Sequence, residues 1–89
     1  MSAPSPDPGS ANTAPESTEA FFRRLGSVTE KLPKRLKQFA QYIAANPDKV
    51  AVSTIAELAE GAAVQPSAVM RFCQEMGFSG FSHMQKLFR

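Results

Sequence analysis

The sequence predicts an all-α fold, a small bundle of five short helices, and three observations lead to this class. Apolar residues recur at three- and four-residue spacing in several segments after residue 15, as in amphipathic helices. Capping and turn residues separate these segments at short intervals. No stretch alternates apolar and polar residues for long, and Val50-Ala51-Val52 is too short, and lacks a partner, to form a strand.

The N-terminal segment differs in composition from the rest of the 89-residue chain. Its first 19 residues hold four of the seven prolines and contain no Val, Ile, Leu, Phe or Tyr. Such a segment cannot bury enough apolar surface to offset the entropy that ordering costs. We therefore expect a disordered Pro/Ser/Ala-rich tail over residues 1–15 and one folded domain over residues 16–89.

The first two helices are predicted from apolar spacing and from the residues that stop it. The first extends from Glu16 or Thr18 to Leu25, with Gly26 as its stop or as a bend. The second has Pro33 in its first turn and ends at Asn46-Pro47. Its polar residues are expected to form a solvated basic face, made of Lys34, Arg35, Lys37, Gln38 and Gln41.

A capping box marks the start of the third helix. In Thr54-Ile-Ala-Glu57, each of the two outer side chains can accept a hydrogen bond from the other residue's backbone N–H. The helix is short and should end near Glu60 or Gly61. Its buried stripe consists of Ile55, Leu58 and Ala59.

Two further helices complete the bundle. The fourth follows Val64, has Pro66 in its first turn and reaches Met76 before Gly77 stops it. The fifth opens near Ser79-Gly80. Its apolar side carries Phe81, Met84, Leu87 and Phe88.

The third and fourth helices, over residues 54–76, have the spacing of a helix-turn-helix, whose second helix lies in the DNA major groove. Ala59 supplies the small residue that is needed where the two helices approach. The turn usually needs a residue that tolerates positive φ, and Ala63 occupies that place at a cost of about 1 kcal/mol. Gly61 could adopt the unusual torsion instead, but the spacing favours Ala63.

The fourth helix separates into two faces when its residues are placed at about 100° intervals. Val69, Phe72, Cys73 and Met76 form the apolar face, and Arg71 lies at the centre of the polar one. Arg71 can reach guanine O6 and N7 or a phosphate, or it could instead pair with Glu75. The residues expected to face bases are Gln65, Ser67, Ala68, Arg71 and Gln74, although Gln65 and Ser67 could merely cap the helix.

The residues expected to contact DNA phosphates lie at helix ends around this polar face. Ser53 and Thr54 begin the third helix, and Pro66 begins the fourth, whose free amide groups favour an anion. Ser79 and Lys86 flank the fourth helix on its C-terminal side.

The distribution of charge agrees with a polyanionic partner. Three of the eight acidic residues lie in the first 19 residues, so residues 20–89 hold ten basic and five acidic residues. A domain with this excess of positive charge attracts polyanions. The three cations of the second helix could therefore reach phosphates rather than only face solvent: Lys34, Arg35 and Lys37.

Other classes of function lack the residues that they need. The single Cys73 excludes an internal disulfide, and His83 has no metal-ligand partner at a suitable spacing. No nucleophile–base set and no glycine-rich phosphate loop occurs, so we expect no enzyme, no cofactor and no metal. No apolar run approaches 18 residues and no secretory signal is present, which predicts a cytoplasmic protein without a membrane span.

Three segments together resemble a known family. They are Ile55-Ala-Glu-Leu-Ala59, Val64-Gln-Pro-Ser-Ala-Val69-Met-Arg71-Phe72 and Met76-Gly77-Phe78-Ser79-Gly80-Phe81. They resemble the N-terminal DNA-binding domain of the RpiR (MurR/RpiR) transcriptional regulators, and the likeness covers roughly residues 20–89. Gln65 stands where the family usually has Ser, and Ala68 where it often has Thr, so a base preference is not carried over.

The resemblance implies a repressor or activator of sugar catabolism that binds double-stranded DNA. Members of the family usually have a C-terminal sugar-isomerase-like domain that binds a phosphosugar effector. These 89 residues contain no such domain, so we expect a part of a longer regulator that is a homodimer at least at full length. The alternative is a helical protein-interaction or dimerisation module without DNA binding. The polar first half of the fourth helix favours DNA, because a protein interface would more often expose Leu, Phe or Tyr there.

Overall fold

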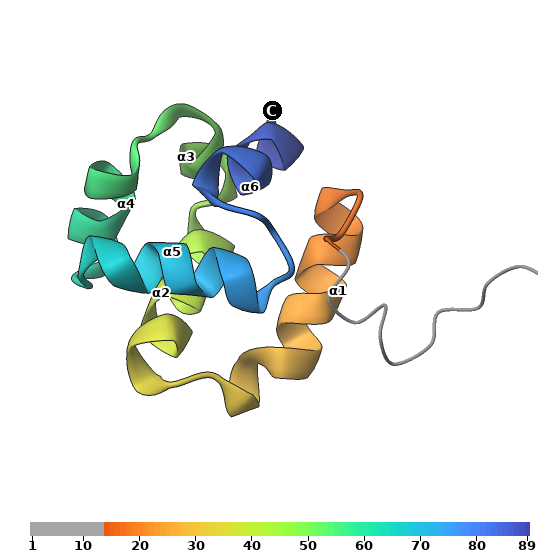
Figure 1. Cartoon of the computed structure of the whole chain (residues 1–89), viewed down its shortest axis with the longest axis horizontal. Coiled ribbons are helices and arrows are strands. Elements are labelled where there is room, and N and C mark those ends of the chain that lie inside the picture. The colour runs from red at the N-terminus through yellow and green to blue at the C-terminus, as the bar shows by residue number, and fades with distance from the viewer. Residues whose placement is uncertain (1–13) are drawn as a thin grey trace, which may run out of the picture.

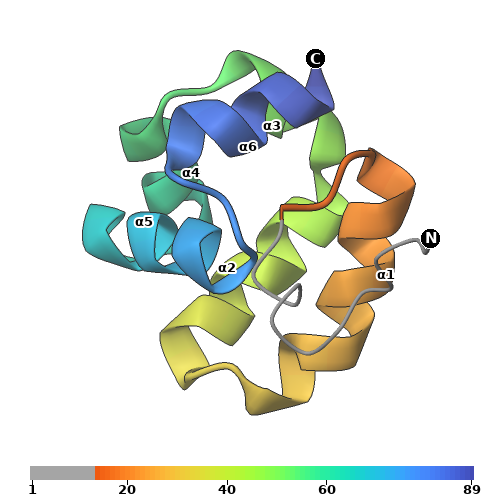
Figure 2. The same cartoon turned by 45° about the vertical axis from the view of Figure 1, so that its right-hand side comes forward.

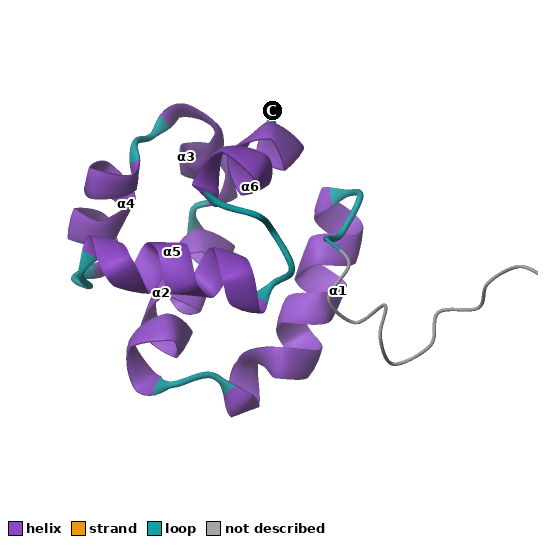
Figure 3. Cartoon of the chain, in the orientation of Figure 1, coloured by secondary structure: helices purple, strands orange, loops and turns teal. Residues whose placement is uncertain are grey.

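The computed structural model describes residues 14–89, and the regular structure in this range is entirely helical, which confirms the all-α class (Figure 1 and Figure 3). The predicted tail lies outside the described residues, except for Ala14 and Pro15. The elements in chain order are α1 (Thr18–Val28), the 3-10 turn η2 (Thr29–Lys31), α2 (Lys34–Ala45), α3 (Pro47–Val52), α4 (Ile55–Ala62), α5 (Pro66–Glu75) and α6 (Phe81–Phe88).

The helices α2, α4 and α5 form the centre of the domain. Each of the three packs against the other two, while α3 packs against α6. Figure 1 shows α5 crossing in front of α2, with α1 at the right and α6 above. The turned view of Figure 2 shows α6 beside α3 at one end of the molecule. This arrangement leaves the outer side of α5 uncovered by other helices of the described chain.

Three phenylalanine rings from three helices anchor the core. Phe21 of α1, Phe39 of α2 and Phe72 of α5 are each fully buried. The centroid of the Phe72 ring lies 5.1 Å from that of Phe39 and 6.3 Å from that of Phe21, with interplanar angles of 72° and 69°. Such edge-to-face contacts add stability beyond the burial of apolar area. Phe72 therefore joins α5 to both α1 and α2.

At the C-terminal end of three helices, a backbone carbonyl accepts a hydrogen bond from a side chain of another helix. Arg24 of α1 donates a hydrogen bond from Nη1 to the carbonyl of Met76, at the end of α5, over 2.9 Å. Gln85 of α6 donates from Nε2 to the carbonyl of Ser53, just beyond α3, over 2.8 Å. Gln38 of α2 likewise donates to the last carbonyl of α4. The last carbonyls of a helix have no partner within it, so these bonds satisfy groups that would otherwise need water.

Two predictions about helix boundaries were wrong. Gly26 does not stop α1, which continues to Val28; a helical glycine costs only about 1 kcal/mol, and contacts of the neighbouring residues offset it. The short helix α3 was missed, so the described residues contain six α-helices rather than five. Its six residues are too few for an apolar period, although Pro47 at its start and the fully buried Val50 are compatible with a helix.

Replacing glycine by alanine is expected to have opposite effects at two helical positions. At the exposed Gly26, an added Cβ would meet no atom within 4 Å, so Gly26→Ala should raise the free energy of unfolding by about 0.5–1 kcal/mol. At Gly61 of α4, an added Cβ would lie 2.6 Å from Cζ of Tyr42, so the ring has to move and Gly61→Ala should lower the free energy of unfolding by up to about 1 kcal/mol. Urea unfolding of both variants measures the difference, and equal effects would contradict it.

Candidate DNA interface

The turn between α4 and α5 ends α4 in a Schellman motif. Ala63 has φ 62° and ψ 42°, and it is the one non-glycine residue with positive φ in residues 14–89. The N–H of Val64 donates to the carbonyl of Ala59 over 2.9 Å, and that of Ala63 to the carbonyl of Glu60 over 3.1 Å. These two bonds define the motif. The predicted positive φ at Ala63 is confirmed, and Gly61 stays inside the helix.

The start of α4 is fixed by the predicted capping box. The hydroxyl of Thr54 accepts a hydrogen bond from the N–H of Glu57 over 3.1 Å, and the Glu57 carboxylate accepts one from the N–H of Thr54 over 2.8 Å. The helix ends at Ala62, one or two residues beyond the predicted end at Gly61 or Glu60. Both ends of this eight-residue helix are therefore defined by local hydrogen bonds.

Gln38 of α2 binds the same turn from outside. Its Nε2 donates to the carbonyl of Ala62 over 2.7 Å and to that of Ala63 over 3.2 Å. The prediction that Gln38 belongs to a solvated face was therefore wrong. The reason is that α2 packs against both helices of the motif, which brings a residue 24 positions away in sequence onto their turn.

Replacing Ala63 by glycine is expected to stabilise the domain by up to about 1 kcal/mol, or to leave it unchanged. The left-handed conformation costs an L-residue about 1–2 kcal/mol, and the greater entropy of unfolded glycine offsets part of the gain. Thermal unfolding provides the measurement. The control is Ala44→Gly at an exposed position in the last turn of α2, which should cost up to about 1 kcal/mol. An equal loss at both positions would show that Ala63 is unstrained.

The two predicted faces of α5 are confirmed. On one side Val69, Phe72 and Cys73 are fully buried. On the other side lie the residues predicted to face bases: Gln65, Ser67, Arg71 and Gln74 are exposed and Ala68 is half-buried. Gln65 precedes the first turn, and its side chain makes no capping hydrogen bond, so the structure does not assign it a capping role.

Arg71 lies on this polar face with its guanidinium available to a ligand. Within residues 14–89 it forms no hydrogen bond or ion pair, so the alternative of a pair with Glu75 is not realised. An arginine in this state can donate two parallel hydrogen bonds to guanine or to a phosphate without first losing a protein partner.

A hollow of about 320 Å³ lies between the N-terminal halves of α2 and α5. Four of the five residues predicted to face bases line it, together with two residues of α2. The described residues that line it are Arg35, Leu36, Gln65, Ser67, Ala68 and Arg71. The sequence left the role of Arg35 open, and no sequence signal pairs it with α5. Gln74 does not line this hollow, because it lies nearly one helical turn beyond Arg71.

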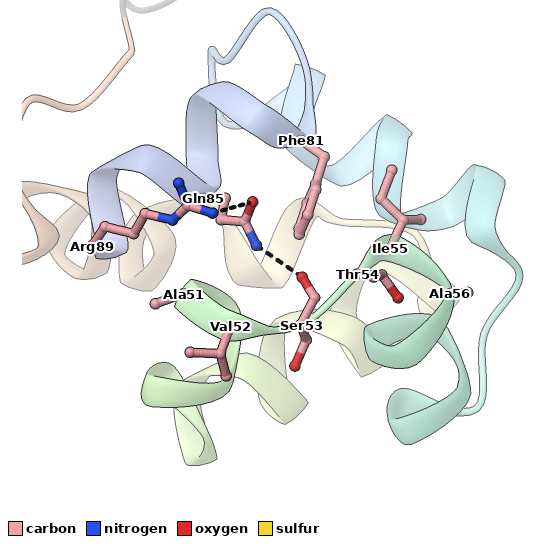
Figure 4. Close-up of a pocket in the computed structure, with 9 residues that line it drawn as sticks. All are labelled: Ala51, Val52, Ser53, Thr54, Ile55, Ala56, Phe81, Gln85 and Arg89. Atoms are coloured by element: carbon pink, nitrogen blue, oxygen red, sulfur yellow. Dashed lines mark hydrogen bonds between the residues drawn. The ribbon is translucent and has the colours of Figure 1, made fainter.

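A second hollow, of about 540 Å³, lies where α3, α4 and α6 meet (Figure 4). Ser53 and Thr54, both predicted phosphate contacts, line it together with Gln85 and Arg89. The carbonyl of Ser53 is occupied by Gln85, whose Oε1 in turn accepts a hydrogen bond from Arg89 over 3.5 Å. Sequence reasoning did not include Arg89, although its place four residues after Gln85 puts both on one side of α6.

The remaining predicted phosphate contacts lie outside these two hollows. Pro66 is exposed at the first position of α5. Ser79 is exposed just before α6, and its N–H donates to Nδ1 of His83 over 3.2 Å. Lys86 is exposed on α6 and lines a small hollow with His83 and Leu87. The site residues therefore fall into a cluster at α5 and positions at the ends of α3, α4 and α6.

Cys73 belongs to the core rather than to the interface. Its side chain is fully buried, and its Sγ lies 3.9 Å from Sδ of Met84. Burial raises the pKa of the Cys73 thiol to about 12, so the thiol stays protonated near neutral pH and is a poor nucleophile.

Within residues 14–89, no helix has the length and apolar character to cross a membrane.

Comparison with known families and structures gives a consistent result. The family described as the helix-turn-helix domain of the rpiR family matches residues 20–87. The N-terminal domain of the transcriptional regulator ybbH from Bacillus subtilis has a crystal structure that is 31% identical in sequence. The two structures superpose with a TM-score of 0.71, and the matched region covers 76% of this chain and 83% of the ybbH domain.

Full-length relatives are transcriptional regulators by name. The HTH-type transcriptional regulator HexR of Pseudomonas aeruginosa is 34% identical over 65 residues, which is 73% of this chain and 23% of HexR. The HTH-type transcriptional regulator YbbH of Bacillus subtilis is 36% identical over 61 residues, which is 68% of this chain and 22% of YbbH. The chain thus spans less than a quarter of the length of these curated relatives.

Proposed function

Because this chain belongs to the rpiR family of helix-turn-helix domains, we propose that it binds duplex DNA in a sequence-specific manner through the N-terminal half of α5. The observation that carries this is the exposed polar face of α5, with Arg71 at its centre and without a hydrogen bond or ion pair to any residue of the range 14–89. The fixed turn at Ala63 supports the same function, because it holds α5 against α4 at a defined angle. The activity is binding and involves no catalysis.

In the proposed complex, α5 lies in the major groove, which is about 12 Å wide and admits one helix. Its base-facing residues are Gln65, Ser67, Ala68, Arg71 and Gln74. Its phosphate contacts come from Ser53, Thr54, Pro66, Ser79 and Lys86. A phosphate only accepts hydrogen bonds, so Ser53 would contact it as a donor, through its hydroxyl. The hydroxyl of Ser79 lies 3.3 Å from Nδ1 of His83, so it would turn from His83 to donate to a phosphate.

The family resemblance extends the proposal to the whole regulator. It supports control of carbohydrate metabolism in the cytoplasm and a phosphosugar effector that binds outside these 89 residues. It also supports a homodimer. A twofold-symmetric dimer would place two copies of α5 on half-sites about one helical turn of DNA apart, so the operator would be a palindrome with half-sites spaced by about 10 base pairs.

The proposal is tested by selection of binding sites from randomised duplex DNA. The 89-residue chain should enrich one sequence, and it should bind this sequence more tightly than a scrambled duplex at the same salt concentration. Folding is checked by circular dichroism before selection. A folded protein that enriches nothing at low salt would overturn DNA binding and favour the alternative of a helical protein-interaction module.

A further inference from the structure

Arg35 lies outside the helix-turn-helix motif but beside its second helix. It belongs to the first turn of α2, is exposed, and lines the same hollow as Ser67 and Arg71 of α5. Two arginines from different helices therefore border one hollow, and no acidic residue among residues 14–89 lines it. This concentration of positive charge beside a DNA-reading face suits an anionic group of the DNA.

A chain of hydrogen bonds connects Arg35 to the turn of the motif. Nη1 of Arg35 donates to Oε1 of Gln38 over 3.3 Å. Nε2 of the same amide donates to the carbonyls of Ala62 and Ala63. The Gln38 amide thus donates through its nitrogen to the turn and accepts through its oxygen from Arg35 at the same time. As a result, the position of the guanidinium is coupled to the turn that sets the orientation of α5.

We propose that Arg35 binds a phosphate on the DNA strand that borders α5, and that Gln38 is the residue that positions it. The inference rests on the proposed DNA binding. It assigns a phosphate rather than a base because one helix, with a diameter of about 10–12 Å, already fills the major groove. Side chains of a neighbouring helix therefore end at the edge of the groove, where the phosphates lie.

The coupling through Gln38 has an energetic consequence. A free arginine side chain loses rotamer freedom when it binds, and this loss lowers affinity. The bond to Gln38 restricts the side chain before DNA arrives, so less freedom is lost on binding. Gln38 itself is half-buried with its amide nitrogen engaged by the turn, so it acts on DNA binding through Arg35 rather than by touching DNA.

The test measures affinity for the selected duplex and for a scrambled duplex over a range of salt concentrations. Arg35→Ala should weaken both complexes by about tenfold, because a phosphate contact carries no sequence information. It should also lower the slope of log K against log salt by about one. Arg35→Lys should keep most of the slope, and Arg23→Ala, at an exposed arginine of α1 outside the hollow, should change neither quantity.

The outcomes separate this inference from the proposed function. If the wild-type chain binds no duplex, the proposed function fails before Arg35 is tested. If the wild type binds but Arg35→Ala behaves like Arg23→Ala, the inference is overturned and DNA binding stands. A changed base preference with an unchanged salt slope would also overturn it, because Arg35 would then read a base.

A double-mutant cycle tests the role of Gln38. Gln38→Ala should weaken binding about threefold in the wild-type background and should have little further effect in the Arg35→Ala background. All four proteins are compared at a temperature where circular dichroism shows that they are folded. Equal losses in the two backgrounds would overturn positioning through Arg35, because Gln38 would then act only through the turn.

Discussion

Replacing Phe72 with alanine is expected to unfold most of the protein at 25 °C. The side chain is fully buried, and its ring contacts Phe21 and Phe39 on two other helices. Truncation of such a residue costs about 3–5 kcal/mol, and a domain of about 70 residues rarely has more stability than this. Loss of helical circular dichroism and of amide chemical-shift dispersion in the variant are the measurements.

Two milder substitutions serve as controls for Phe72. Phe72→Leu keeps an apolar side chain at the site and should leave a folded protein with a lowered melting temperature. Phe88→Ala removes a half-buried ring at the end of α6, and its smaller burial should make the loss smaller. A cooperative transition of Phe72→Ala within a few degrees of the wild type would show that the three-ring cluster is not the centre of stability.

Arg71→Ala is expected to lower affinity for the selected DNA sequence by about 1–3 kcal/mol and to relax preference at one base position. The residue is at the centre of the polar face of α5 and forms no hydrogen bond or ion pair within residues 14–89 that the substitution would break. Its free energy of unfolding should therefore stay within about 0.5 kcal/mol of the wild type. Titration and a repeated selection measure the two effects.

Conservative and neighbouring substitutions distinguish base reading at Arg71 from general attraction. Arg71→Lys keeps the charge but loses the paired donors that match guanine, so non-specific affinity should persist while base preference weakens. Glu75→Ala, one turn away, should not change the selected sequence. A folded Arg71→Ala variant that selects the same sequence with unchanged affinity would contradict the assignment.

Helix boundaries with local signals could be predicted from the sequence. The capping box of Thr54 and Glu57 and the stop at Gly77 involve residues within a few positions of each other, and the structure has both. Gly26 and α3 lacked such signals. In the sequence, a glycine inside a helix such as Gly26 looks the same as one that ends a helix, although only Gly77 takes positive φ. A six-residue helix shows less than two turns of any period.

The residues of the candidate site also fall into a group that the sequence predicts and a group that it does not. The two faces of α5 follow from its periodicity alone, so the polar face around Arg71 was predictable. The contribution of α2 was not, because the periodicity of α2 identifies only its buried side. Arg35 and Gln38 look like ordinary surface residues until the packing of α2 against α4 and α5 brings them to the turn.

The side chains that close the ends of helices have a consequence for how the chain folds. Arg24 binds a carbonyl 52 residues away, Gln85 one 32 residues away and Gln38 one 24 residues away. The final turns of α5, α3 and α4 are therefore complete only after a distant helix has docked. Helices of this length are marginal alone, so we expect the domain to fold and unfold in a single cooperative step.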